Sequence, residues 1–528
     1  MKGALSRKLS EAWSLLASGK PKPMPRGWLT RDEIARLHAA SPGSSDGVDE
    51  QTWRDLDLDA WLAQATGDCS VFGRQWLFAR LRGCAISDRA DVVQLPQLKA
   101  LIDDERLARS WIDATAAMRC AEVEVAGTLF APLPSVLPHW VSRLWAVPAG
   151  FGIAPGLIAA GLFFPGALLI VACVLVSGAV QIRLHPQSAA WQKQKRAIAQ
   201  LLSCAMALRD PAAEDAACAP PMPDLKPLWA AFGPTWLERL AGLAEYADLL
   251  LLSRYRRLAA DFTQIGLHRR ALQDVFLNMS QREANAWLAC HLRASESFCW
   301  NEARGGLAGA TLTGMCNPLL ARSRPIDVAL GVRGIFLTGK NGSGKSTLLR
   351  SLAMNMVMAR ALGVCMAEAA SVPRALVQTS IRIEDSLSLG RSLYVAELLR
   401  ASDMLERAYG SMVSLVLFDE IFRGTNHMES VSAAAAVIQR LSAQAMVVVS
   451  SHHIDLAPWV ERSMLPLLLA ETATGLVLQP GVLAETNGID LLLSHGFDAD
   501  LHANALALHG LLAQRAAGKL MAGPASSP

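Results

Sequence analysis

The sequence is poor in charged residues and carries almost no net charge. Charged side chains make up 18% of its 528 residues, against about 25% in a typical soluble chain, and hydrophobic residues make up 52%. Intrinsic disorder is thereby excluded, and contact with a membrane is indicated. The formal net charge is +3, so bulk charge does not indicate nucleic-acid binding, and any basic binding surface must be local.

The cysteines follow no disulfide or zinc-binding pattern. The sequence has ten of them, with no CxxC pair and no Cys/His cluster at zinc spacing. We therefore expect reduced, mostly buried thiols in a cytosolic compartment. Lys2, Arg7 and Lys8 precede an apolar stretch that Ser10 and Glu11 interrupt, so a cleaved signal peptide is not expected.

One long stretch has no charged side chain at all. It runs for 39 residues, from Leu144 to Ile182. As a single helix it would be ~58 Å long, nearly twice the ~30 Å hydrocarbon core of a bilayer, so two shorter spans fit better. Pro165 and Gly166 favour a reversal, which predicts a helical hairpin with its turn at 163–166.

The flanks of this stretch resemble membrane–water interfaces. Basic residues and tryptophans stand on both sides: Trp140, Arg143 and Trp145 before it, and Arg183, Trp191, Lys193, Lys195 and Arg196 after it. We interpret the stretch as a transmembrane hairpin with both flanks facing the cytoplasm. The alternative is an apolar helix pair buried in a soluble core.

The rest of the chain changes character near residue 310. Helical periodicity dominates before it, whereas short β-type runs alternate with helical segments after it, which is typical of a parallel sheet flanked by helices. The predicted fold class is an α/β P-loop NTPase domain preceded by an all-α core domain that contains the hairpin. The predicted divisions are an N-terminal segment (1–49), the first part of the helical core (50–139), the transmembrane hairpin (140–183), the second part of the core (184–310), the ATPase domain with C-terminal dimerisation helices (311–515) and a flexible tail (516–528).

A phosphate-binding loop follows the strand predicted at 334–338. The segment from Gly339 to Ser346 matches GxxxxGK[ST] between that strand and an apolar helix. Glycines there allow the positive φ that turns N–H groups toward phosphate oxygens, and a helix N-terminus adds its positive dipole end. Lys345 should bridge the β- and γ-phosphates, and Ser346 should hold Mg²⁺. The alternative is a glycine-rich turn without a ligand. The residues predicted to bind ATP are Gly339, Asn341, Gly342, Ser343, Gly344, Lys345, Ser346 and Thr347.

Two carboxylates follow the apolar strand predicted at 415–418. Asp419 would bind Mg²⁺, and Glu420 would act as the general base toward the attacking water. Alone, such a pair is often a helix cap. After the strand at 446–450, His452 is placed to reach the γ-phosphate or the water, with the adjacent His453 as a competitor and a structural histidine as the alternative.

These motifs, in this order, resemble the MutS mismatch-repair family. The resemblance rests on Asn341 in the loop, the run 385–397, the segment 419–425 and the pair Ser451-His452, and it continues into 486–489. Upstream it reaches Asn317-Pro318 and the segments 52–56 and 70–82, so it covers about residues 50 to 510. It implies ATP and Mg²⁺ as cofactors and a homodimer in which Ser392 reaches the partner's nucleotide, unless Gly390 to Ser392 is an ordinary turn.

The departures from the family indicate a subgroup. Nothing resembles the mismatch-reading domain with its Phe-x-Glu wedge, and the apolar hairpin takes the place of the DNA-embracing clamp. The chain therefore resembles membrane-associated MutS-related proteins, with the inner (cytoplasmic) membrane as its location and the ATPase domain facing the cytoplasm.

Two hypotheses of function follow. The first is a membrane-anchored dimeric ATPase that binds DNA, mismatched or branched by family resemblance, in DNA repair. The second is an ATP-driven conformational switch for a membrane or protein partner without a DNA role. A transport ATPase is a weaker third, because no Leu-Ser-Gly-Gly-Gln signature occurs. Arginines of the helical region could meet phosphates or anionic lipid: Arg254, Arg256, Arg257, Arg269 and Arg270.

Overall fold

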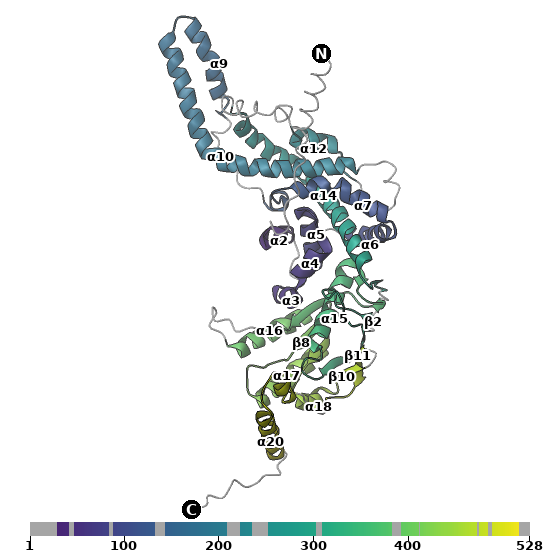
Figure 1. Cartoon of the computed structure of the whole chain (residues 1–528). Helices are drawn as coiled ribbons and strands as arrows, with labels where there is room; N and C mark the ends of the chain where they lie inside the picture. The colour runs from purple at the N-terminus through teal and green to yellow at the C-terminus, as the bar shows by residue number, and fades with distance from the viewer. Residues whose placement is uncertain are drawn as a thin grey trace, which may run out of the picture. The chain divides into compact units, whose positions relative to one another are not determined.

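The chain divides into two compact units, one comprising residues 1–47 and 62–296 and the other residues 48–61 and 297–528 (Figure 1). The computed structural model describes residues 29–41, 47–83, 88–132, 143–208, 222–234, 252–302, 309–382, 392–410, 412–472, 475–483 and 488–516. The predicted divisions of the chain stay a prediction, and much of the predicted N-terminal segment and nearly all of the tail lie outside the described residues. The eight described cysteines are free thiols.

The first unit is helical over its described part. Its central element is α14 (Ser253–Ala294), which packs against helices from both sides of the hairpin. The other elements are α2 (Arg31–Ala40), α5 (Val71–Arg82), α6 (Asp88–Asp103), α7 (Glu105–Ala114), the 3₁₀ helix η2 (Ala116–Cys120), α8 (Ala126–Phe130), α9 (Ala146–Ala159), α10 (Phe163–Ala207) and α12 (Leu225–Phe232).

A buried carboxylate joins α14 to the start of α5. Glu283 accepts hydrogen bonds from the Ser70 amide at 2.9 Å and from the Ser70 hydroxyl, and Ser70 is the N-cap of α5. Burial raises the pKa of Glu283, while the Ser70 hydrogen bonds oppose that shift. The N-terminus of α5 therefore meets a carboxyl group supplied by the central helix.

A buried ion pair joins α10 to α14 beyond the hairpin. Lys195 Nζ lies 3.1 Å from Asp261 Oδ2, with only 8% and 9% of the two side chains exposed. The indole N–H of Trp191 donates to the same carboxylate at 2.8 Å, and the indole ring packs on Phe262. The interpretation of Trp191 and Lys195 as interfacial anchors is therefore wrong, because α14 covers both side chains.

Asp261→Ala is expected to destabilise the helical unit by ~3–5 kcal/mol, because it leaves the Lys195 charge buried without a partner. The melting temperature of the full-length protein in detergent, followed by helical circular dichroism, should fall by roughly 10 °C. Glu122→Ala is the matched control, since it breaks the Lys193–Glu122 pair, whose side chains are 47% and 40% exposed. That control should cost at most ~1 kcal/mol. Equal shifts for the two variants would contradict the prediction.

Helices α9 and α10 form the predicted hairpin, but its turn lies three residues earlier than expected. Gly161, with φ +84°, ends α9, and its amide bonds to Ile158 O while the Leu162 amide bonds to Leu157 O. Pro165 instead lies in the first turn of α10, where proline is tolerated. In the described part of the chain, α10 is the one helix long and apolar enough to cross a membrane, and α9 is shorter.

The second unit contains a six-stranded sheet in the order β11-β10-β4-β9-β8-β7. All neighbouring strands are parallel except β11, which pairs antiparallel with β10. The strands are β4 (Gly334–Thr338), β7 (Ala375–Ser380), β8 (Val413–Asp419), β9 (Ala445–Ser450), β10 (Met464–Thr472) and β11 (Gly475–Pro480). This mixed, mainly parallel sheet agrees with the predicted α/β class.

Helices and two small sheets complete this unit. A core cluster that includes Phe336, Phe418 and Val449 joins the central strands to α16 and α17. The remaining elements are α3 (Glu50–Asp55), α4 (Leu58–Thr66, which continues into the first unit), β1 (Cys299–Trp300), β2 (Ala310–Met315), β3 (Ile326–Leu330), α15 (Lys345–Leu362), β5 (Val364–Cys365), β6 (Ala369–Ser371), α16 (Leu393–Ala408), α17 (His427–Ser442), η5 (Ile454–Leu456), α18 (Ala457–Val460), α19 (Asp490–Ser494) and α20 (Ala499–Ala516).

Candidate functional site

Three adjacent parallel strands bring the predicted site residues to one edge of the sheet. β4 leads into the loop 339–344, β9 leads into Ser451 and His452, and β8 ends at Asp419 before Glu420. Parallel strands end at the same edge, so the segments that follow them meet there. The amide of Ser451 bonds to Leu337 O at 3.2 Å, which fixes the end of β9 against β4.

The loop after β4 has the backbone of an anion site. Gly342 and Gly344 have φ of +77° and +95°, a region that favours glycine. Gly344 begins α15 without any side-chain cap, so the first N–H groups of an 18-residue helix are not occupied by a capping side chain. The Ser343 hydroxyl is buried and has no protein partner among the described residues. These features fit a phosphate ligand.

Lys345 lies inside this loop. Its ammonium donates to the carbonyl oxygens of Gly339 at 2.9 Å and Lys340 at 3.0 Å. Burial lowers the pKa of Lys345, and the nearby charges of Asp419 and Glu420 oppose that shift. The ammonium thus lies against the loop carbonyls and interacts electrostatically with the two carboxylates, which fits a site that would hold a phosphate and a cation.

The two carboxylates have different partners. Asp419 accepts from the Ser450 hydroxyl of β9. Glu420 has φ +59°, an unusual backbone for a glutamate, and its amide bonds to Ser450 O at 3.0 Å. Its carboxylate lies 2.9 Å from His452 Nε2 and 3.7 Å from Arg423 Nη1. The hydrogen bond with His452, more than any other contact, lowers the pKa of Glu420.

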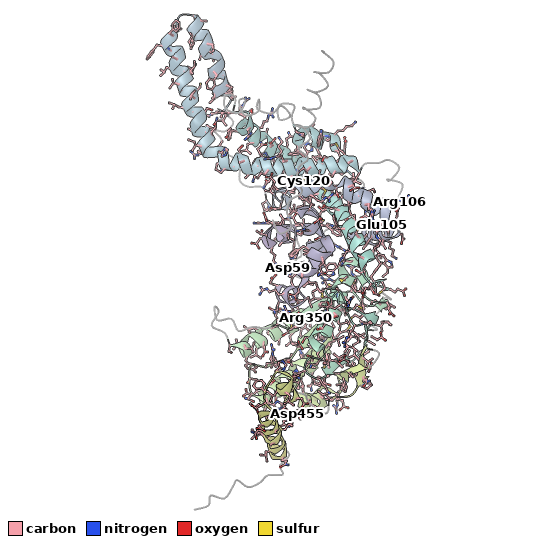
Figure 2. All side chains as sticks on the ribbon, viewed as in Figure 1. Asp59, Glu105, Arg106, Cys120, Arg350 and Asp455 are labelled. Carbon is pink, nitrogen blue, oxygen red and sulfur yellow. The ribbon has the colours of Figure 1, made fainter. Side chains whose placement is uncertain are left out.

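His453 does not compete for Glu420. Its Nδ1 lies 3.1 Å from Nδ1 of His427, and His427 Nε2 lies 3.0 Å from Asp455, which Figure 2 labels. Burial and the neighbouring His427 lower the pKa of His453. Of the two histidines that the sequence left open, His452 is the one in contact with Glu420.

Arg423 and Glu397 are part of the site although the sequence assigned them no role. Arg423 Nε lies 3.6 Å from Glu397, and the buried Glu397 carboxylate also accepts from the Gly424 amide at 3.2 Å. Gly424 is needed because a Cβ there would lie 2.5 Å from the Tyr394 amide nitrogen. The i,i+3 spacing of Glu420 and Arg423 does not indicate their pairing, because residues 420–423 form a turn and not a helix.

Ser392 begins α16 but does not cap it. Its side chain is exposed and makes no hydrogen bond to the helix N-terminus. Gly390 and Arg391, its neighbours in the predicted motif, lie outside the described residues. Val395, Leu398 and Leu399 are exposed at helical spacing from Ser392, so an apolar stripe continues from it along one side of α16.

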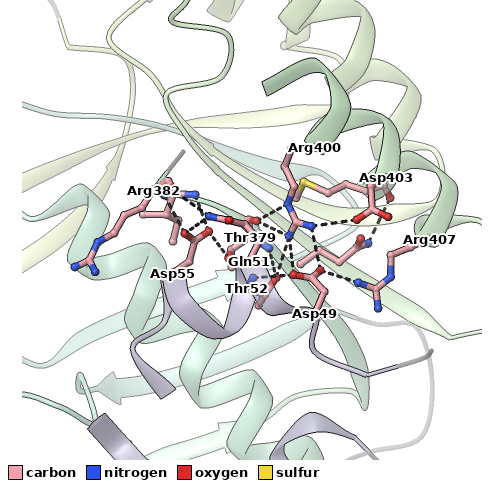
Figure 3. A network of polar contacts seen from close by, with 12 residues as sticks. Asp49, Gln51, Thr52, Asp55, Thr379, Arg382, Arg400, Asp403 and Arg407 are labelled. Carbon is pink, nitrogen blue, oxygen red and sulfur yellow. Dashed lines mark hydrogen bonds and ion pairs between the residues drawn. The ribbon is translucent and has the colours of Figure 1, made fainter. Parts of the chain in front are cut away.

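A polar network fixes α16 and the end of β7 to the segment 48–61 (Figure 3). Asp49 accepts from Arg400 at 3.1 Å and from Arg407 at 2.7 Å. Asp55 accepts from the Thr379 hydroxyl at 2.7 Å, and Arg350, labelled in Figure 2, donates to the carbonyl of Asp55. This segment, which crosses the predicted boundary at residue 49, therefore holds α16 and the end of β7 in place.

Comparisons with known proteins match this region. A family model described as MutS domain V matches residues 335–466. The DNA mismatch repair protein MutS of Thermus aquaticus is 31% identical over 204 residues, which are 37% of this chain and 25% of that protein. MutS of Streptococcus pneumoniae serotype 19F (strain G54) is 33% identical over 181 residues, 32% of this chain and 21% of that protein.

The similarity therefore covers only part of this chain and only part of each relative. The chain spans about a quarter of the length of the curated relatives it matches. The match nevertheless contains β4, the phosphate-loop residues, Asp419, Glu420 and His452, so it coincides with the edge of the sheet described above. The predicted resemblance to the MutS family is confirmed: residues 335–466 match the model of MutS domain V, and the chain is related to the family through this segment.

Proposed function

We propose that this chain is a membrane-associated, dimeric MutS-related ATPase. The observation that carries the proposal is the meeting of Lys345, the pair Asp419-Glu420 and His452 at the ends of three adjacent strands. The loop residues predicted from the sequence would bind the phosphates, and Ser346 and Asp419 would hold Mg²⁺. That ion would neutralise charge on the phosphate oxygens.

Glu420 is the general base in this proposal. Its lowered pKa keeps it ionised at neutral pH, so it can accept a proton from a water molecule. His452 and Arg423 both contact its carboxylate and therefore fix its position. Lys345 would offset the negative charge of the phosphates. A hydrogen bond from its ammonium to a phosphate oxygen is stronger than one between neutral groups.

The proposed active form is a homodimer. The exposed Ser392 and the apolar stripe on α16 fit a surface that meets a second copy, and Ser392 would then bind the partner's nucleotide. Exposed leucines on α20, among them Leu501, Leu508 and Leu512, offer a second apolar surface that fits the predicted dimerisation segment. Both surfaces belong to the ATPase unit.

Membrane attachment is part of the proposal, with the inner (cytoplasmic) membrane as the location and the ATPase domain in the cytoplasm. The uncharged parts of α9 and α10 supply the anchor: large apolar side chains from Ile153 to Ile182 are exposed. Such a surface has no favourable environment in water.

The proposal that the chain binds DNA rests on the similar proteins, since both relatives are named DNA mismatch repair proteins. One observation favours the second hypothesis, a switch for a membrane or protein partner. Arg269, one of the arginines proposed to meet phosphates, instead donates to the carbonyl oxygens of Leu129 and Ala131. The deciding measurement is ATP turnover by the detergent-purified protein with homoduplex, mismatched or branched DNA. Acceleration by any of them supports the DNA role, and an unchanged rate with all three supports the switch.

His452→Ala is expected to move the acid limb of the pH–rate profile to higher pH. His452 is the largest contributor to the lowered pKa of Glu420, so its removal raises that pKa toward the ordinary value. Activity requires the ionised base, so in the variant it is lost at a higher pH than in the wild type. Initial ATP turnover rates from pH 4 to 8 test this. His495→Ala, far along the chain from Glu420, is the control, and an unmoved limb in His452→Ala would contradict the assignment.

Ser392→Ala should leave ATP binding almost intact but lower hydrolysis roughly 10-fold or more. A γ-phosphate ligand that arrives only on dimer closure contributes to the transition state more than to the ground state. ATP binding by nucleotide fluorescence and steady-state turnover measure the two effects separately. Ser432→Ala on α17 is the matched control and should change neither.

Mixing variants separates action in trans from action in cis. In a heterodimer of Ser392→Ala with Lys345→Ala, one site has an intact Lys345 and faces the subunit that retains Ser392. That site should turn over ATP, provided the two sites work independently. Activity that never exceeds the sum of the two homodimers, with heterodimers shown to form, would contradict either the trans contact or the independence of the sites.

A further inference from the structure

The hairpin of α9 and α10 is shorter than the hydrocarbon thickness of a bilayer. α9 holds 14 residues, which is ~21 Å at 1.5 Å per residue, against ~30 Å of hydrocarbon. The uncharged part of α10 is longer, but Val180 and Leu184 near its lower end are buried with Leu252 and Tyr255 of the helical unit. The length that lipid can surround is therefore set by α9.

The tip of the hairpin has no polar side chain. Leu162, Phe163 and Phe164 are 50%, 69% and 80% exposed, and their neighbours from Ala159 to Gly166 are alanine, glycine and proline. A tip that emerged on the far side of a membrane would expose these apolar side chains to water, which is unfavourable. The tip composition fits hydrocarbon instead.

The turn also satisfies much of its own backbone. The amides of Ala160, Gly161 and Leu162 bond to carbonyls of the last turn of α9, and the Gly166 amide bonds to Leu162 O. Pro165 contributes no N–H group at the start of α10. A turn of this kind can lie in hydrocarbon, where each unsatisfied backbone group would cost several kcal/mol.

Arginines gather at the opposite end, the base of the hairpin. Arg143 and Arg183 bound the uncharged stretch and are exposed. Leu252 and Tyr255 pack in the same cluster as Leu144 and Leu184, which brings the first turn of α14 to this end. We define the basic collar as the exposed Arg143, Arg183, Arg256 and Arg257. Arginines at this level are placed to meet anionic headgroups.

We propose that the hairpin enters an anionic bilayer from one side only, with its tip inside the hydrocarbon and the basic collar on the headgroups of the entry leaflet. The proposal rests on the membrane attachment proposed above and specifies its topology. Both flanks then lie on the same side because the chain never reaches the other.

A thiol at the tip tests the topology in the full-length protein. The Phe164→Cys variant is added to preformed phosphatidylethanolamine/phosphatidylglycerol vesicles and first recovered by flotation. A membrane-impermeant maleimide is then supplied either outside or trapped in the lumen, and labelling at position 164 is read by peptide mass spectrometry, which separates it from native cysteines. Val332→Cys, at an exposed position of the ATPase unit, is the control that outside reagent must label.

The outcomes distinguish the topology from the attachment. Flotation without labelling at position 164 from either side supports the proposal. Labelling by luminal reagent shows a spanning hairpin, and labelling by outside reagent in floated vesicles shows a hairpin that is not inserted, so either overturns it. Failure to float in both the variant and the wild type overturns the membrane attachment itself.

A lysine at the tip gives an independent readout. Phe164→Lys should lower retention after alkaline carbonate extraction several-fold, because the ammonium would be buried in hydrocarbon. A spanning hairpin would place it in water, and unchanged retention would overturn the proposal. Leu175→Lys, exposed within the uncharged part of α10, should lower retention in either topology and shows that the assay is sensitive.

The basic collar predicts a dependence on lipid charge. Replacing Arg143 and Arg256 together by Gln should weaken attachment to the anionic vesicles several-fold while attachment to phosphatidylcholine vesicles stays unchanged. An equal loss on both kinds of vesicle, or no loss on either, would overturn the assignment of the collar to headgroups.

Discussion

Glu420→Gln is expected to lower ATP turnover by about 10²- to 10⁴-fold while ATP remains bound, because a general base contributes a factor of that size. The substitution keeps the shape of the side chain and removes its charge, so proton acceptance is lost, and the contacts with His452 and Arg423 become uncharged on this side. ATP should still raise the melting temperature, since a ligand that binds the folded state stabilises it. Steady-state turnover and ATP-induced thermal shifts on the same preparation measure the two effects.

Two further observations make this test specific. Glu461→Gln makes the same chemical change at an exposed glutamate of the same unit and should leave turnover unchanged. Light scattering with ATP should show the Gln variant accumulating as a dimer, since closed dimers that cannot hydrolyse ATP do not reopen. Normal turnover by Glu420→Gln would place the general base elsewhere, and loss of the thermal shift would show that Glu420 acts in binding.

The central strands were predictable because a strand buried on both faces has an apolar sequence. The runs predicted at 334–338, 415–418 and 446–450 correspond to β4, β8 and β9, with bounds that differ by at most two residues. The site residues follow from the same fact, since they come directly after these strands. β2 and β3 were not predicted: they are short, and their alternating burial gives a weak signal in a single sequence.

The errors in the hairpin have two causes, one local and one distant along the chain. The sequence predicts a turn at Pro165, but proline in the first turn of a helix removes a donor that has no intrahelical acceptor there. Gly161, which adopts φ +84°, is the residue that ends α9. Trp191 stands in the sequence where an interfacial anchor would, yet its partner Asp261 is 70 residues away along the chain, so no local pattern indicates that contact.

The site contacts that the sequence does not indicate join segments that are far apart along the chain. Asp49 and Arg400, which form an ion pair, are 351 residues apart in the sequence. Arg423 contacts Glu397, which lies in the first half of α16. Charged residues at such separations have no characteristic spacing. Likewise, only the folded chain shows that His452 contacts Glu420 while the adjacent His453 contacts His427.

Lys345→Ala is expected to abolish measurable ATP binding at micromolar nucleotide and to lower turnover at least 100-fold. The ammonium lies against the loop carbonyls and interacts electrostatically with the two carboxylates, so it is the cation that would offset phosphate charge at this loop. Removing one such charge-assisted donor from a site commonly lowers the rate by about 10²- to 10³-fold. Radiolabelled ATP retention and the ATP-induced thermal shift measure the binding loss directly.

Lys340→Ala is the matched control for this prediction. Lys340 lies in the same loop and carries the same charge, but its side chain is exposed, and its backbone carbonyl, which accepts from Lys345, survives the substitution. The control should therefore keep the thermal shift and most of the turnover. If Lys340→Ala lost as much as Lys345→Ala, the effect would be one of general loop charge. If Lys345→Ala hydrolysed ATP at a near-normal rate, the loop 339–347 would not be the phosphate site.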